Sequence, residues 1–221
     1  MSRTSHVLGV FLLLGAALGT APTPARAEGL EGDETALPEL PPPPELRPQK
    51  RVVEVNAGLV GAFANSALCP PGPDCILGGG FALGFTYAWR RPSGFTLGLG
   101  YDLWILGGGT VWDASTLQDI RFAGRYLFLP EISVHPYLIY GAGVVGLGDL
   151  FRIATAGAAL DAGFGVEWEI TDSLAFTFSF ELRTFMVVPF TTHDDGVERG
   201  QDPMPNMLGA IQLGVLIIPG Q

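Results

Sequence analysis

Residues 80–106 alternate large and small side chains with a period of two. In GFALGFTYAW every odd position is bulky, whereas every even position is glycine, alanine or threonine. After RRPSG the large residues resume at Phe95 and recur at every second position as far as Ile105. Successive side chains of a strand point to opposite faces of its sheet. The pattern therefore predicts a hairpin with one bulky apolar face and one face of small side chains.

The same period recurs along the chain from Arg51 onward. Short connectors near 91–94, 129–133 and 171–173 alternate with longer ones at 64–76, 107–117, 148–156 and 187–205. Short turns on one rim and long loops on the other are typical of outer-membrane barrels. We therefore predict an all-β fold, an eight-stranded antiparallel up-and-down transmembrane β-barrel with both ends on the short-turn, periplasmic side. Its strands are expected within 51–63, the two halves of 80–106, 119–128, 135–147, 158–170, 174–186 and 206–218.

The composition favours lipid as the solvent of the bulky face. Hydrophobic residues make up 48% of the chain and charged ones 15%, and there are 31 glycines. After the N-terminus no apolar run reaches the roughly 18 residues of a membrane-spanning helix, whereas a closed barrel satisfies its backbone in hydrocarbon. A soluble barrel of the lipocalin type, with the large side chains inside, is the rival fold. It is disfavoured because an eight-stranded interior is too narrow to hold the rings of every strand.

Ionisable residues gather on the small-side-chain face, which would line the lumen. Buried charges are tolerated when they are paired. We expect Asp102 and Asp119 to pair with Arg121 and Arg125, and the glutamates of the sixth and seventh strands to pair with Arg183. The set is interpreted as a structural ion-pair network, with a polar, anion-excluding pore as the alternative. It comprises Glu54, Asp102, Asp119, Arg121, Arg125, Asp161, Glu167, Glu169, Glu181 and Arg183.

Aromatic residues collect beside the predicted short turns. Membrane barrels carry aromatic girdles at the membrane–water interfaces, so the clustering supports the orientation given above. The predicted interface girdle consists of Tyr87, Trp89, Phe95, Tyr126, Phe128, Trp168 and Phe176.

The N-terminus reads as a cleavable secretory signal over residues 1–27. Arg3 precedes an apolar core at 7–18, and Ala25-Arg26-Ala27 fits the small-x-small cleavage rule. An acidic, proline-rich periplasmic tail or linker follows at 28–50, and the barrel domain would occupy 51–221. Cleavage removes Arg3 and Arg26 and no acid, which moves the formal charge from −10 to −12. A chain this acidic is not expected to bind nucleic acid.

Two stretches resemble the small outer-membrane β-barrel proteins of the OmpA-barrel type, a porin-like class. HPYLIYGAGVVGL at 135–147 is similar to their Pro-Tyr-x-x-x-Gly-x-Gly strand, and 163–182 is similar to their Gly-x-Gly-x-Glu strand, Thr-Asp turn and following aromatic strand. The resemblance implies an integral protein of the outer membrane of a Gram-negative cell. It further implies contact with outer-membrane lipid and lipopolysaccharide, and insertion by the barrel-assembly machinery. The chain departs from that pattern at Pro219-Gly220-Gln221, where such proteins usually end in an aromatic residue.

Candidate chemistry is sparse and lies near the predicted loops and turns. Cys69 and Cys75 share one short loop of an exported chain, which predicts a disulfide rather than a metal site. Ser133 and His135 are the candidates for nucleophilic catalysis, but no carboxylate is evident to orient the histidine. Trp112 is interpreted as a packing anchor of its loop, with partner contact as the alternative. An acidic stretch of the last long loop, either solvated or cation-binding, contains Asp194, Asp195, Glu198 and Asp202.

These features predict a structural protein that presents surface loops, with no catalysis and no cofactor or metal. A narrow channel or carrier for small molecules is the first alternative, and a lipid-modifying membrane enzyme is the second. The pattern assigns no ligand, surface partner or oligomeric state.

Overall fold

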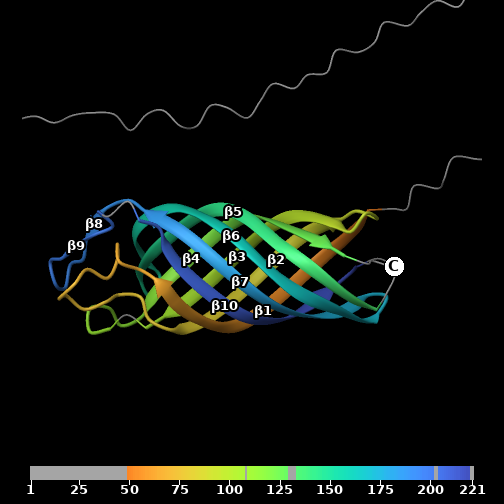
Figure 1. Cartoon of the computed structure of the whole chain (residues 1–221), viewed down its shortest axis with the longest axis horizontal. Coiled ribbons are helices and arrows are strands. Elements are labelled where there is room, and N and C mark those ends of the chain that lie inside the picture. Colours follow the sequence, from red (N-terminus) through yellow and green to blue (C-terminus); the bar gives the residue numbers. More distant parts are fainter. Residues whose placement is uncertain (1–48, 108, 129–132, 202–203, 220–221) are drawn as a thin grey trace, which may run out of the picture. The chain divides into compact units, whose positions relative to one another are not determined.

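The computed structural model describes residues 49–107, 109–128, 133–201 and 204–219. Among these residues, eight antiparallel strands close into a barrel (Figure 1), as predicted. The predicted signal and nearly all of the proposed tail lie outside the described residues. The barrel strands are β1 (Lys50–Ala64), β2 (Gly80–Arg90), β3 (Phe95–Leu106), β4 (Ser115–Leu127), β5 (Val134–Asp149), β6 (Arg152–Thr171), β7 (Leu174–Val187) and β10 (Asn206–Ile217).

Each strand pairs with its sequence neighbours, and β10 pairs with β1 to close the ring. The register followed around the ring from Val53 through Tyr87 and Thr184 returns to β1 at Ala64, beside a bulge. This offset is the stagger that tilts the strands of a closed barrel. Both ends of the described barrel lie at the end that carries the short turns (Figure 1).

The hairpin of β5 and β6 differs from the prediction. The expected long loop at 148–156 is instead a tight turn at Leu150 and Phe151, and Leu150 adopts a positive φ of 51°. The two strands run past the expected loop and are the longest of the barrel. Ala154 and Ala156 occupy outward positions of β6 there, so no bulky–small alternation marked this stretch as a strand.

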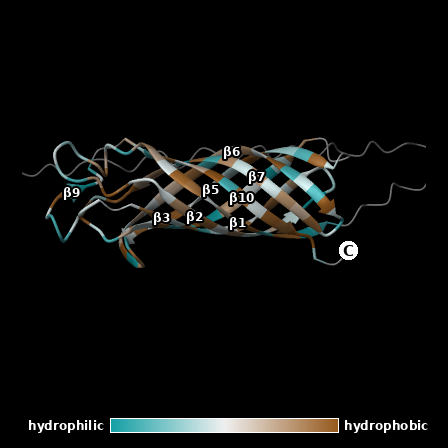
Figure 2. Cartoon of the chain, turned by 90° about the horizontal axis from the view of Figure 1, so that it is seen from below, coloured by the Kyte–Doolittle hydropathy of each residue, from teal (hydrophilic) through white to brown (hydrophobic). Residues whose placement is uncertain are grey.

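The bulky alternate residues of the strands point outward. Leu59, Phe122 and Leu213 each expose two thirds or more of their surface, and the same parity carries exposed apolar side chains on every barrel strand. Figure 2 shows hydrophobic positions distributed along the strands of the barrel wall. No helix among the described residues is long and apolar enough to span a membrane.

On both faces of the barrel wall, aromatic rings of one strand pack against glycines of a neighbouring strand. The ring of Tyr140 lies across Gly124, and that of Phe63 lies across Gly209 on the outer face. Inside the barrel, the ring of Tyr137 occupies the space beside Gly165. A side chain at these glycines would overlap the ring, so their small size is required by close packing.

An apolar plug fills the lumen at the long-loop end, which the sequence prediction did not include. Trp104, Phe185 and Leu208 point inward from the strands and are no more than 1% exposed. Loop residues pack onto them, including Trp112, whose ring stacks on Phe190 at 6.1 Å between centroids. Trp112 is thus a packing anchor, as predicted. The rest of the buried plug consists of Val60, Leu68, Ile76, Leu77, Ala82, Leu106, Val111, Leu117, Val145, Leu147, Ala159 and Ala210.

Candidate functional site

The charged residues of the lumen form two clusters, one behind the other along the barrel. The loop-side cluster lies next to the apolar plug and contains six groups from four strands. The turn-side cluster lies nearer the short turns and contains four. The loop-side members are Asp102, Asp119, Arg121, Asp161, Glu181 and Arg183, and the turn-side members are Glu54, Arg90, Arg125 and Glu167.

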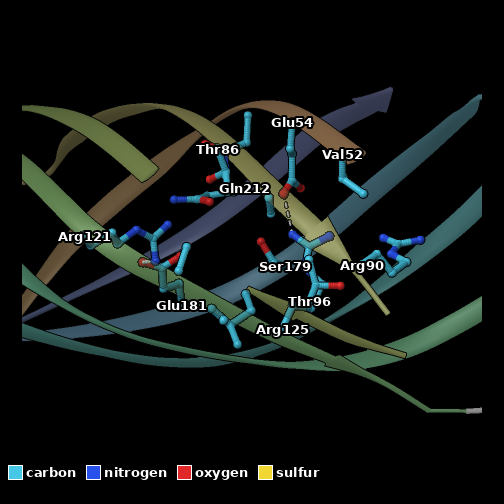
Figure 3. A pocket seen from close by; sticks show the side chains of 15 residues that line it. Val52, Glu54, Thr86, Arg90, Thr96, Arg121, Arg125, Ser179, Glu181 and Gln212 are labelled. Carbon is cyan, nitrogen blue, oxygen red and sulfur yellow. Dashed lines mark hydrogen bonds and ion pairs between the residues drawn. The ribbon is translucent and has the colours of Figure 1, made fainter. Parts of the chain in front are cut away.

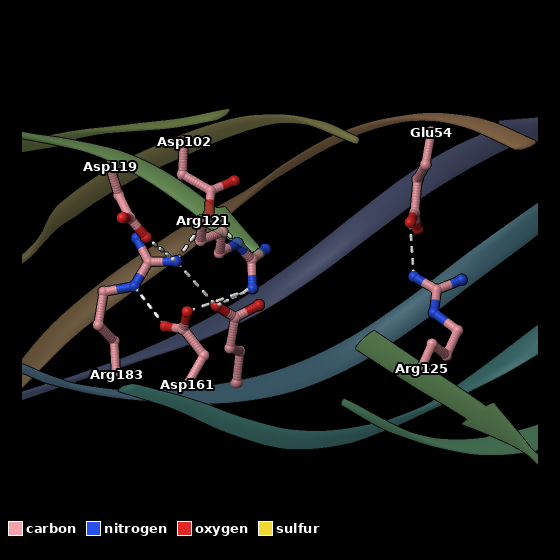
Figure 4. Close-up of polar contacts among 8 residues, drawn as sticks. Glu54, Asp102, Asp119, Arg121, Arg125, Asp161 and Arg183 are labelled. Atoms are coloured by element: carbon pink, nitrogen blue, oxygen red, sulfur yellow. Dashed lines mark hydrogen bonds and ion pairs between the residues drawn. The ribbon is translucent and has the colours of Figure 1, made fainter. Parts of the chain in front are cut away.

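Arg183 on β7 is the centre of the loop-side cluster (Figure 4). Its Nε donates to Asp161 Oδ1 at 2.6 Å, and its Nη2 donates to Asp102 Oδ2 at 2.6 Å and Glu181 Oε1 at 3.0 Å. The same Nη2 lies 3.2 Å from Asp119 Oδ2. The side chain is fully buried, so these charge-assisted contacts replace its hydration.

Arg121 on β4 is the second cation of this cluster. Its Nε lies 2.8 Å from Asp102 Oδ2, and its Nη1 lies 3.3 Å from Glu181 Oε1 and 3.5 Å from Asp161 Oδ2. Asp102, Asp161 and Glu181 therefore each contact both guanidinium groups. The predicted pairing of Arg121 with Asp102 is present.

The turn-side cluster pairs two arginines with two glutamates. Arg90 forms a bidentate contact with Glu167, with N–O distances of 2.8 and 2.7 Å. Arg125 donates to Glu54 across the lumen and lies 3.4 Å from Glu167. The guanidinium carbon of Arg125 is also 4.1 Å from the ring centroid of Tyr137, a geometry that favours cation–π attraction.

Several predicted pairings differ from those in the structure. Arg125 contacts Glu54 and Glu167 instead of Asp102 and Asp119, because it lies closer to the short turns than either aspartate. Glu167 contacts the two arginines of its own cluster instead of Arg183. Arg90 was missed because it stands beside Arg91 at the start of a turn, although its even position gives it the inward parity of β2.

Glu169 does not join the lumen network. Its side chain is 40% exposed at the turn-side rim, where Oε1 lies 3.3 Å from Nε2 of buried His135. Glu169 keeps the inward parity of β6, since it pairs with buried Ala175, but it lies at the open rim, two residues beyond Glu167. Glu169 thus supplies the carboxylate beside His135 that the sequence did not reveal. The backbone carbonyl of Ser133 accepts a hydrogen bond from the Glu169 amide.

A small polar cavity separates the two clusters (Figure 3). Its volume is about 40 Å³, and Thr86, Ser179 and Gln212 line it together with charged side chains of both clusters. One water needs roughly 10–15 Å³ by this measure, so the cavity has room for a few waters. The space is too small for an organic solute.

A loop platform covers the long-loop end of the barrel. It consists of the described parts of 65–79, 107–114 and 188–205, the last with the short hairpin of β8 (Phe190–Thr191) and β9 (Glu198–Arg199). Cys69 and Cys75 form the predicted disulfide within it. The Gly200 amide donates to the Ala67 carbonyl at 2.7 Å and thereby joins two of these loops.

Arg199 is the main cross-link between the loops of the platform. Its Nη1 donates to the Leu68 carbonyl at 2.7 Å, and its Nη2 donates to the Asp74 carbonyl at 3.0 Å. Within its own loop, Nη2 donates to Asp195 Oδ2 at 2.6 Å and Nε to Thr192 Oγ1 at 3.2 Å. The side chain of Arg199 is buried. Its contacts anchor the last long loop to the loop that contains the disulfide.

Asp195 is held in its charged form by this arrangement. Its partial desolvation alone would raise the pKa, but hydrogen bonds from Thr192, the Val197 amide and Arg199 hold the pKa of Asp195 below its usual value. The neighbouring acids Asp194 and Glu198 are exposed, and Asp202 lies outside the described residues. No three His, Cys, Asp or Glu side chains in the described ranges are arranged to hold a metal ion.

The seven aromatics of the predicted girdle lie at the turn-side rim. Each is within three residues of the short-turn end of its strand. Tyr87 packs edge-on against Trp89, and Tyr126 against Phe128, with 5.1 Å between ring centroids in both pairs. Five of the seven are at least 40% exposed, namely Trp89, Tyr126, Phe128, Trp168 and Phe176.

Comparison with solved structures identifies the type of barrel. The chain is similar to Neisserial surface protein A (NspA), with a TM-score of 0.57 and 14% identity over 77% of this chain and 99% of that one. The N-terminal β-barrel domain of Pseudomonas aeruginosa OprF has a TM-score of 0.43 at 14% identity, covering 77% of this chain and all of that one. A major outer membrane protein from Thermus thermophilus has a TM-score of 0.45 at 13% identity, covering 78% of this chain and all of that one.

No protein-family model matches the chain, and no curated protein is significantly similar to it in sequence. The likeness to NspA, together with the closed ring of eight strands, shows that the chain has the fold of the small outer-membrane β-barrels.

Proposed function

We propose that this protein is a non-conducting anchor of the outer membrane that presents a rigid loop platform at the cell surface. One observation carries the proposal: the lumen is filled in successive layers, while the loops above it are cross-linked. A barrel without a passage can act only through its surfaces. In the described chain, the structure outside the barrel wall consists mainly of the long loops at one end.

The layers in the lumen argue against the channel alternative. Two residues beyond Asp102 on β3 stands Trp104, and two residues beyond Arg183 on β7 stands Phe185. Arginine and aspartate side chains therefore block one level of the lumen, and large apolar side chains block the next. A conducting path would have to break fully buried ion pairs and displace the apolar plug. Separating a buried pair costs several kcal/mol.

The outward face supports residence in lipid. The bulky side chains of the barrel wall remain exposed to whatever surrounds it, and an apolar surface of this extent is unusual on a soluble monomer. We infer that outer-membrane lipid and lipopolysaccharide cover this face. The aromatic rim would then lie at the periplasmic interface, and the loop platform would face outward.

Conductance across planar lipid bilayers tests the closed lumen. We expect purified, refolded protein to give a flat current trace, with a general porin inserted under the same conditions as the positive control. Reproducible single-channel steps from the wild-type barrel would refute the non-conducting anchor. The same preparation should migrate faster on an SDS gel before boiling than after it, because a folded barrel resists the detergent.

Surface labelling tests the platform. A cysteine-free background, in which both loop cysteines are replaced by alanine, would carry a single new cysteine at Glu198 in the platform or at Ser173 in a short turn. We expect a membrane-impermeant thiol reagent to label the loop variant on intact cells and the turn variant only after lysis. The reverse pattern would contradict the orientation. An unchanged lipid A profile with and without the gene would exclude the lipid-modifying alternative.

A further inference from the structure

The loop-side cluster contains more acids than bases. Four carboxylates surround two guanidinium groups, and none of the six side chains is more than 4% exposed. The turn-side cluster is balanced, with Glu54 and Glu167 facing Arg90 and Arg125. With every carboxylate ionised, the loop-side cluster would hold two unbalanced negative charges in a closed lumen. Isolated charge in such a place is neutralised by a partner or by a proton.

Asp119 is the least compensated of the four carboxylates. It lies directly opposite Asp102 in the pairing of β3 with β4, and the Cβ atoms of residues paired in this way are about 5 Å apart. Neither carboxylate oxygen of Asp119 accepts a hydrogen bond from the described residues, and among these residues its one ion contact is with Arg183 Nη2 at 3.2 Å. A like charge so close disfavours the ionised form of the carboxylate that has the weaker cationic support, which is Asp119.

The other three carboxylates are better supported. Asp102 Oδ2 lies within 2.8 Å of both guanidinium groups. Asp161 accepts from Arg183 Nε at 2.6 Å. Glu181 contacts both arginines and also borders the small cavity, where water can solvate it. A proton placed on any of these three would replace a strong ionic contact, whereas a proton on Asp119 replaces a weak one.

We propose that Asp119 is a buried proton-binding site that the folded barrel fills at mildly acidic pH, and that this proton keeps the acid-rich lumen closed. Its loss as the pH rises adds a negative charge beside Asp102 and draws water into the cluster. The unfolded chain has released this proton well below neutral pH. The proton is thus bound only by the folded barrel, whose stability falls as the pH rises.

The groups that face Asp119 set the range over which it responds. β3 contributes Asp102, β4 contributes Arg121, β6 contributes Asp161, and β7 contributes Glu181 and Arg183. β5 contributes Gly143 and Val145, which do not titrate. On the cavity side of the cluster, β1, β2 and β10 place the uncharged Asn56, Thr86 and Gln212. The two arginines favour release of the proton, and the three acids favour its retention.

Infrared spectroscopy of the full-length barrel in lipid vesicles tests the proposal directly. At mildly acidic pH we expect the carbonyl band of a protonated carboxylic acid that shifts when aspartate carboxyls are labelled with ¹³C. Asp119→Asn should abolish this band, and alkaline pH should remove it from the wild type. The absence of a label-sensitive acid band, or its persistence in Asp119→Asn, would overturn the proposal. So would a band that responds only to labelled glutamate.

Stability measurements separate the proton from a merely structural aspartate. Asp119→Asn keeps the shape of a neutral acid, so its urea midpoint at mildly acidic pH should equal that of the wild type and should no longer fall as the pH rises. The matched control Asp161→Asn removes an ionised partner of Arg183, so it should lower the midpoint at neutral pH. Equal losses in the two variants, or failure of Asp119→Asn to fold, would contradict the proposal. A midpoint that depends on sodium, with no acid band, would indicate a bound cation instead.

Discussion

The guanidinium carbon of Arg183 lies 4.3 Å from the centre of the Trp104 ring, at the boundary between the ion pairs and the apolar plug. One face of this arginine is occupied by the aromatic ring, while its Nε and Nη2 donate to carboxylates. Through this contact, one side chain belongs to the loop-side cluster and also packs against the apolar plug. Arg183 is therefore the residue on which the closed interior depends most.

Replacing Arg183 with methionine should destabilise the barrel strongly. The change leaves four carboxylates around Arg121 alone, and breaking a buried pair in this way costs about 3–5 kcal/mol. Urea unfolding in lipid vesicles, followed by tryptophan fluorescence, measures the loss. Arg91→Met is the matched control, because Arg91 is exposed in the turn after β2 and should change stability by less than about 0.5 kcal/mol. Similar midpoints for the two variants would show that the cluster does not stabilise the barrel.

Two strand glycines should respond very differently to the same substitution. A Cβ at Gly165 would lie 2.5 Å from the Phe178 carbonyl oxygen and from Cζ of Tyr137, whereas a Cβ at Gly61 would meet nothing within 4 Å. Gly165→Ala must therefore displace Tyr137, the ring that packs on Arg125, at a cost of about 1–3 kcal/mol. Gly61→Ala should be close to neutral. The urea midpoints of both variants test this, and a neutral Gly165→Ala would mean that the ring has space to move.

The parity of the side chains made most of the barrel predictable. Bulky residues at alternate positions such as Phe81 and Leu83 defined both the strands and their lipid face. The charged residues stood on the opposite parity because a narrow lumen tolerates polar side chains only in pairs. Cys69 and Cys75 were predictable because they share one short loop of an exported chain.

The parity of a residue does not show its position along the barrel axis. Several of the predicted ion pairs were wrong for this reason. Arg125 and Glu54 are 71 positions apart, and they meet only because the stagger of the ring brings β1 and β4 to one level. Trp104 has the parity of Asp102, but lies one step closer to the loops and belongs to the plug. The turn at Leu150 was hidden because glycine and alanine on both faces of β5 and β6 erase the alternation.

Removal of the disulfide should loosen the platform and leave the barrel intact. Cys69 and Cys75 close a small loop, and the chain-entropy model assigns about 2 kcal/mol to a closure of this size. In the double alanine variant, limited proteolysis should cut within 65–79 faster than in the wild type. The shift between unboiled and boiled protein on an SDS gel should remain, because no barrel strand includes these residues. Loss of that shift would show that the loop is needed for the barrel to fold.

Arg199 should control the order of the last long loop. Arg199→Gln removes the charge that binds two backbone carbonyls and Asp195, so amide hydrogen exchange of Thr192 and Val197 should accelerate while the strands keep their protection. Arg152→Gln is the control, because Arg152 is exposed beside the β5–β6 turn and its side chain pairs with no acid of the described residues. Equal exchange in the two variants would contradict the cross-link.

The same contact should weaken in acid. The pKa of Asp195 is lower in the folded loop than in the unfolded chain, so its contribution to loop stability is fully present above the usual carboxyl pKa of about 4. That contribution is lost as the pH falls through the lowered value, because the protonated acid no longer pairs with Arg199. We expect protection of the Val197 amide, corrected for the intrinsic exchange rate, to fall over this range in the wild type. In Asp195→Asn the protection should be low throughout and independent of pH, and an unchanged pH profile in that variant would assign the effect to another acid.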